Sequence, residues 1–147
     1  MMALPMESIH PLVVHFPIAL LIASLVFEIL SFCFRIEAWR TTGRWCLVAG
    51  TAGALAAVLS GLKAGEIAKH SFEIHQVMEL HERVGILVLV HATILSLWWL
   101  LSLRWPVLFR RTLYLALWAL LVALLSFGAH LGGRLVYEFG VGGPFGR

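Results

Sequence analysis

The chain has 147 residues, of which 61% are apolar and 13% charged, so it has room for a single domain over residues 1–147. Soluble domains are about half apolar and one quarter charged, and this chain has too few polar residues to cover its apolar ones. Water-soluble enzymes and nucleic-acid-binding proteins are therefore excluded. The formal net charge of +3 comes from Lys and Arg residues that flank apolar runs, which is typical of membrane topology signals. We expect an all-α membrane protein in contact with the lipid bilayer and without a nucleic-acid partner.

Four apolar segments are each long enough to cross a bilayer, which takes about 20 residues in a helix. They cover residues 11–34, 43–63, 82–104 and 109–131. Short connections between consecutive helices predict an up-down bundle. The connections 35–44 and 104–111 carry six arginines against one glutamate, and clustered positive charge at helix ends marks the cytoplasmic side. We therefore expect both termini on the outer side.

The second predicted helix carries small residues at regular spacing. Gly53, Ala57 and Gly61 recur every four residues, with Gly50 and Ala54 beside them. Small residues at this spacing let helix backbones approach closely in a membrane. They could equally make room for a bulky planar ligand, and the sequence does not choose between the two.

Two segments lie outside the predicted spans. The connection 63–80 has Ile67, Ile74 and Met78 at helical spacing among polar residues, which predicts an external amphipathic helix at the membrane surface. The C-terminal segment 132–147 is rich in glycine and is expected to be an ordered loop or lid on the outer side.

All seven histidines fall in the outer half of the predicted bundle or outside it. They are His10, His15, His70, His75, His81, His91 and His130. A polar side chain at membrane depth needs a partner and usually marks function. At 1.5 Å per residue, His15 lies about 5 Å and His91 about 10 Å below the outer boundary, which singles out these two. His70 and His75 are expected to be solvated surface residues.

Neutral imidazole is a good ligand for haem iron, zinc and copper. In an up-down bundle the first and third helices are parallel and are expected to lie on a diagonal. His15 and His91 are therefore the best predicted pair for the two axial positions of a b-type haem. His10 and His81 form a second, shallower pair on the same two helices.

Three further residues complete the predicted site. His130, near the outer end of the fourth helix, is an alternative ligand or a partner for a haem propionate. Arg83 and Arg134 lie where propionates would emerge. Without a metal, the same imidazoles could hydrogen-bond a quinone head group.

Glu28, in the half of the first helix nearer its connection to the second, is the one acidic residue expected to be buried in the membrane. A carboxyl group in lipid is costly, so Glu28 should face the bundle and be neutral or paired with Arg44 or a backbone group. We expect its role to be structural.

Two long motifs and one short one carry a family resemblance. The stretch Ile9–Leu21, Ile-His-Pro-Leu-Val-Val-His-Phe-Pro-Ile-Ala-Leu-Leu, resembles the opening of the bacterial domain-of-unknown-function family 2231 of predicted membrane proteins. The stretch Gly128–Gly142, Gly-Ala-His-Leu-Gly-Gly-Arg-Leu-Val-Tyr-Glu-Phe-Gly-Val-Gly, resembles its closing motif, and His81-Glu82 resembles the start of its third helix. A histidine often stands in that motif where this chain has Phe139, so no ligand is available there. The resemblance implies a four-helix domain with a histidine-rich outer face in the bacterial cytoplasmic membrane.

The residues predict a small b-type cytochrome-like subunit with one or two haems in the outer half of the bundle. It would pass electrons between an outer-face partner, such as a periplasmic cytochrome, and quinone or another redox subunit of a larger membrane complex. The alternatives are a non-redox accessory or scaffold subunit and an outer-facing zinc or copper site. A stand-alone enzyme is least supported, because no nucleophile with a matching base occurs.

Overall fold

The structure is a computed structural model that describes residues 6–67, 71–106 and 110–141, and these residues form four long helices without a strand. The helices are α1 (Met6–Phe34), α2 (Glu37–Ile67), α3 (Phe72–Arg104) and α4 (Arg111–Tyr137). Each is long and apolar enough to cross a membrane. The predicted all-α, four-helix membrane fold is therefore confirmed.

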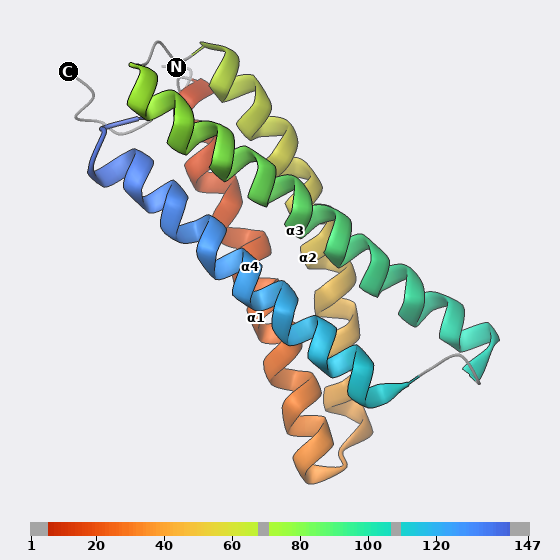
Figure 1. The fold of residues 1–147 in the computed structure, drawn as a ribbon. Helices are drawn as coiled ribbons and strands as arrows, with labels where there is room; N and C mark the ends of the chain where they lie inside the picture. The colour runs from red at the N-terminus through yellow and green to blue at the C-terminus, as the bar shows by residue number, and fades with distance from the viewer. Residues whose placement is uncertain (1–5, 68–70, 107–109, 142–147) are drawn as a thin grey trace, which may run out of the picture.

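The helices run alternately up and down around a common centre (Figure 1). Each packs against its two neighbours, α1 with α2 and α4, and α3 with α2 and α4, so that α1 and α3 face each other across a diagonal. We call the end at which α1 begins and α4 ends the terminal end. The opposite end, where α1 leads into α2 and α3 leads into α4, is the turn end.

The interior is filled by side chains from all four helices. Leu21, Leu47, Leu95, Leu121 and Trp118 are fully buried. Large apolar side chains are also exposed on the outside of every helix. A water-soluble monomer rarely exposes so much contiguous apolar surface, so this outer surface is the one that lipid covers.

Glycines of α2 let it pack closely against α1. A Cβ atom at Gly50 would lie 2.8 Å from Leu21, and one at Gly53 would lie 3.2 Å from Phe16. The same is true of Gly43, where the nearest atom is a backbone oxygen of α1 at 2.9 Å. The predicted close approach of backbones at the small residues of α2 is confirmed for Gly50 and Gly53.

The first connection is shorter than the sequence predicts. Only Arg35 and Ile36 separate α1 from α2, because α2 begins at Glu37 and not near residue 43. Arg35 makes the turn with a positive φ of 58°. Glu37 in the first turn of α2 forms an ion pair with Arg40, and a negative charge near a helix N-terminus favours this earlier start.

The connection 63–80 does not form a separate amphipathic helix. Residues 63–67 continue α2, and residues 72–80 form the first turns of α3, so the polar residues extend two spanning helices. Residues 68–70, with His70, lie outside the described residues. Adding a residue to an existing helix costs less free energy than nucleating a new helix. This explains why α2 and α3 extend beyond the predicted spans.

The glycine-rich segment after residue 131 also begins as helix and not as a loop. α4 continues through Gly132 and Gly133 to Tyr137. A glycine inside a helix costs about 1 kcal/mol, and burial of Leu131 and Leu135 on the inner face offsets this cost. The predicted lid thus concerns only the residues beyond Tyr137, and residues 142–147 lie outside the described part of the chain.

Candidate functional site

His10 of α1 and His81 of α3 meet in the interior of the terminal end. Their ring centroids are 6.1 Å apart and their planes are inclined at 77°, an edge-to-face contact. The two helices lie on a diagonal and have no close backbone contact, so the imidazoles bridge the centre of the bundle. Both side chains are only partly exposed.

Hydrogen bonds to neighbouring helices determine which nitrogen of each imidazole ring carries the proton. Nδ1 of His81 lies 2.9 Å from the carbonyl oxygen of Gly128 in α4, and a carbonyl can only accept, so Nδ1 carries the proton. Nδ1 of His10 lies 3.0 Å from Oγ of Ser60 in α2. The Ser60 hydroxyl donates its single proton to the carbonyl oxygen of Ala57, so Oγ accepts from His10.

The consequence is the same for both histidines. A neutral imidazole protonated at Nδ1 keeps its lone pair on Nε2. In metal sites the ligating histidine usually donates its other ring N–H to a carbonyl or another oxygen, which fixes the ring and its tautomer. His10 and His81 both have this arrangement, so their Nε2 atoms are suited to bind a metal ion.

A glycine of a neighbouring helix makes room for each ring. A Cβ atom at Gly61 of α2 would lie 2.9 Å from Cε1 of His10. A Cβ atom at Gly132 of α4 would lie 3.0 Å from Cε1 of His81. Gly61 therefore makes room for the ring of His10.

His15 and His91, which the sequence predicts as the best pair of haem ligands, do not contact each other in the structure. The His15 ring is exposed on α1, and its Nδ1 lies 2.6 Å from the carbonyl oxygen of Pro11 in the same helix. His91 turns toward α4, where its Nε2 donates to the carbonyl oxygen of Leu117 at 3.0 Å. The pair that does meet across the diagonal is His10 and His81, which the sequence predicts as the second, shallower pair.

The remaining predicted residues lie around the terminal end. His130 is exposed on α4 and His75 on α3. Arg83 forms an ion pair with a glutamate of its own helix, and Arg134 forms one with Glu138 at 2.9 Å. Exposed ion pairs of this kind contribute about 1 kcal/mol or less, so both guanidinium groups can exchange partners readily.

Ser60, Gly128 and the two glycines beside the rings are not among the residues that the sequence singles out as a site. Gly128 and Gly132 do fall within the closing motif, four residues apart, and Ser60 precedes Gly61 directly. A serine–glycine pair near a helix end is common, however, and only the fold shows that it faces His10.

Among the residues that the structure describes, no group of three or more His, Cys, Asp or Glu side chains could hold a metal ion. Protein zinc sites use three or four side-chain ligands. Two imidazoles match the number of side-chain ligands of a bis-histidine haem. By the number of donors the pair therefore fits a haem rather than a zinc ion, and the two rings contact each other edge to face in this structure.

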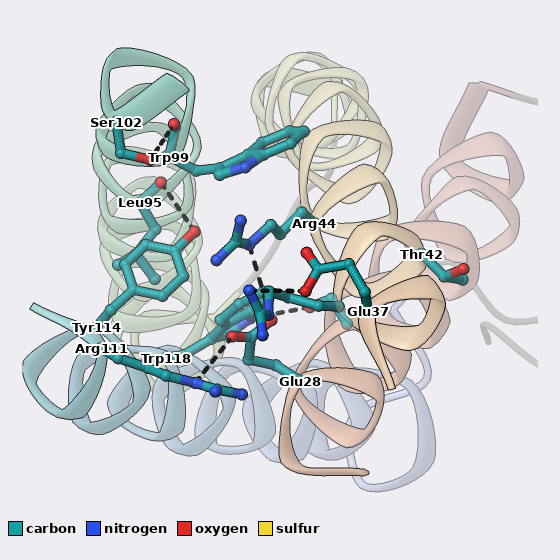
Figure 2. A network of polar contacts seen from close by, with 12 residues as sticks. Glu28, Glu37, Thr42, Arg44, Leu95, Trp99, Ser102, Arg111, Tyr114 and Trp118 are labelled. Atoms are coloured by element: carbon teal, nitrogen blue, oxygen red, sulfur yellow. Dashed lines mark hydrogen bonds and ion pairs between the residues drawn. The ribbon is translucent and has the colours of Figure 1, made fainter. Parts of the chain in front are cut away.

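A second polar cluster lies at the turn end, around Glu28. This carboxylate is fully buried. Its two oxygens lie 3.8 Å from Nε of Arg44 in α2 and 3.8 Å from Nε of Arg111 in α4 (Figure 2). The predicted pairing of Glu28 with Arg44 is confirmed, and Arg111 is a further partner. An ion triad that joins α1, α2 and α4 agrees with the expected structural role.

The model of a family described as "Predicted membrane protein (DUF2231)" matches residues 6–143 of the chain. A comparison of the chain with curated proteins and with solved structures found no match.

Proposed function

The chain belongs to the DUF2231 family of predicted membrane proteins, and we propose that it is a small b-type cytochrome-like subunit that binds haem between His10 and His81. The observation that carries the proposal is the pair of imidazoles on diagonal helices, each tied through Nδ1 and each with its lone pair on Nε2. Haem supplies one-electron chemistry when it is bound.

The residues around the pair have defined roles in this proposal. Ser60 and the carbonyl of Gly128 orient the two rings and keep both Nε2 atoms unprotonated. Gly61 and Gly132 let the two rings lie close against the backbones of α2 and α4. Because the rings now contact each other edge to face, haem binding requires that they separate. Arg134, which pairs with Glu138 at the same end of α4, would exchange that partner for a haem propionate in this proposal.

The position of the site in the membrane suggests how electrons would travel. The terminal end carries the histidines, whereas clustered arginines mark the turn end. By the positive-inside rule the turn end faces the cytoplasm of a bacterial inner membrane, and the terminal end faces the periplasm. The subunit would then exchange electrons with a periplasmic cytochrome or another subunit at one face and with quinone or a redox partner in the membrane.

The test is an absorption spectrum of the chain, expressed with ample haem and purified in detergent, before and after reduction with dithionite. We expect a sharp Soret band and split visible bands on reduction, typical of a low-spin b-type haem. His10→Phe and His81→Phe should each abolish this spectrum. His75→Phe is the matched control, since it removes an exposed histidine of α3 and should change nothing.

The same spectrum shows which of the two pairs of histidines binds the haem. His15→Phe and His91→Phe should retain the low-spin bands if His10 and His81 are the ligands. Loss of the bands in these variants, with retention in the other two, would assign the haem to His15 and His91. A featureless spectrum from folded wild-type protein would refute haem binding and favour an accessory or scaffold subunit whose exposed histidines, such as His130, contact a partner.

A further inference from the structure

A cavity of about 290 Å³ opens at the turn end, on the opposite side of the bundle from the histidines. Its lining combines three basic residues of α2 and α4 with residues at the end of α3, and it consists of Arg40, Arg44, Ser102, Leu103, Pro106 and Arg111. Of these residues, Leu103 and Pro106 are exposed. The volume is several times the roughly 30 Å³ share of one liquid water molecule, so the cavity admits a polyatomic ligand.

The positive charge at this cavity exceeds the negative charge that compensates it. Three arginines line it, and two glutamates form ion pairs with them. Glu28 lies 3.8 Å from Arg44 and from Arg111, and Glu37 pairs with Arg40 at 2.8 Å. One positive charge therefore remains without a partner of opposite sign among these residues. All three arginines are partly exposed, and a surplus positive charge at a partly enclosed site favours the binding of an anion.

Two of the arginines also hold donors without hydrogen-bond partners among the described residues. These donors are Nε of Arg40 and both Nε and Nη2 of Arg111, all buried. More than nine in ten buried polar groups in proteins have a hydrogen-bond partner, so unsatisfied donors at a cavity point to a missing acceptor. Glu28 does not satisfy Arg111, because an Nε–oxygen distance of 3.8 Å is too long for a hydrogen bond.

We propose that this cavity binds a phosphate-class anion, namely inorganic phosphate or the phosphodiester head group of an anionic lipid. The planar guanidinium group presents paired donors that match two phosphate oxygens, which makes Arg the usual residue for such anions. Arg111 is also the first residue of α4, so the positive end of that helix lies at the cavity. Basic pockets between membrane helices are known to hold lipid head groups. The proposal does not depend on the haem site.

Two binding measurements on the purified full chain distinguish the two sources of phosphate. In the first, the chain in phosphate-free buffer is titrated with inorganic phosphate, with chloride at equal ionic strength as the reference, and thermal unfolding is followed by tryptophan fluorescence. In the second, native mass spectrometry counts bound phosphatidylglycerol, with zwitterionic phosphatidylcholine as the reference. Saturable binding in the first identifies a free anion, and saturable binding in the second alone identifies a lipid head group.

Three variants locate the binding. Arg40→Gln and Arg111→Gln should each weaken it about tenfold or more, because each removes a charge-assisted donor. Arg104→Gln is the matched control, since it removes an exposed arginine at the same end that does not line the cavity, and it should leave the affinity unchanged.

A further variant keeps the test decisive if the arginine variants do not fold. Ser102→Val retains every charge but narrows the cavity, and it should also weaken binding. No saturable binding in either measurement would overturn the proposal, as would equal losses in Arg104→Gln and Arg111→Gln. Unchanged affinity in Ser102→Val would also overturn it, because the anion would then bind outside the cavity.

Discussion

Two adjacent glycines of α4 allow a sharp test of how tightly His81 is held. A Cβ atom added at Gly132 would lie 3.0 Å from Cε1 of His81, whereas one added at Gly133 would meet nothing within 4 Å. Both glycines are helical and partly buried. Gly132→Ala and Gly133→Ala therefore differ chiefly in the contact with the imidazole.

The expected magnitude follows from two opposing effects. Replacing a helical glycine with alanine stabilises a helix by about 1 kcal/mol, and this gain is common to both variants. At Gly132 the added methyl group must displace the His81 ring, which Nδ1 ties to the carbonyl of Gly128 in the same helix. Overpacking of this kind costs about 1–3 kcal/mol, and a ring shift of a few tenths of an ångström leaves the hydrogen bond in place. Gly132→Ala should thus be about 1–3 kcal/mol less stable than Gly133→Ala.

The assay is reversible unfolding by sodium dodecyl sulfate in mixed micelles, followed by tryptophan fluorescence. The difference between the two variants is the informative quantity, because the helix-propensity gain cancels. Haem retention measured on the same samples should fall in Gly132→Ala and stay at the wild-type level in Gly133→Ala. Equal unfolding midpoints together with equal haem retention would show that the His81 ring moves freely, and would refute the argument that Gly132 shapes the site.

Two further predictions use matched variants at the two ends of the bundle. Glu28→Gln should lower the free energy of unfolding by about 1–3 kcal/mol, because it removes a fully buried charge from its contacts with two arginines. Glu37→Gln, which breaks a more exposed pair, should cost less than about 1 kcal/mol. Equal losses in the same unfolding assay would contradict the role of burial. Ser60→Ala removes the acceptor of His10 Nδ1 and should weaken haem binding about 10- to 100-fold in a haem titration, whereas Ser126→Ala, an exposed serine of α4 that bonds only within its helix, should leave it unchanged.

The sequence by itself determined the class of protein and the number of helices. Apolar length is a local property, and about 20 apolar residues form a membrane helix whatever their neighbours are. The same holds for the small residues of α2, since Gly50 and Gly53 permit close approach to any helix beside them. Helix ends were less predictable, because α2 and α4 continue through polar and glycine-rich residues once they have formed.

Only the tertiary structure decided which histidines meet. His10 and His15 are five residues apart, so they lie about 140° apart around α1 and cannot both face the centre of the bundle. The spacing alone does not say which one faces inward. In a soluble helix the polar face would settle the question, but the helices of this chain are apolar on the lipid side as well as inside.

The partners of the two polar clusters were likewise fixed by the fold. Ser60 and Gly128 come from helices other than those of the histidines that they orient. Arg111, the first residue of α4, forms an ion pair with Glu28 of α1, which is distant in the sequence. Each of these contacts depends on the rotation of one helix against another. That rotation is set by side-chain packing over the whole bundle, which no local pattern of residues encodes.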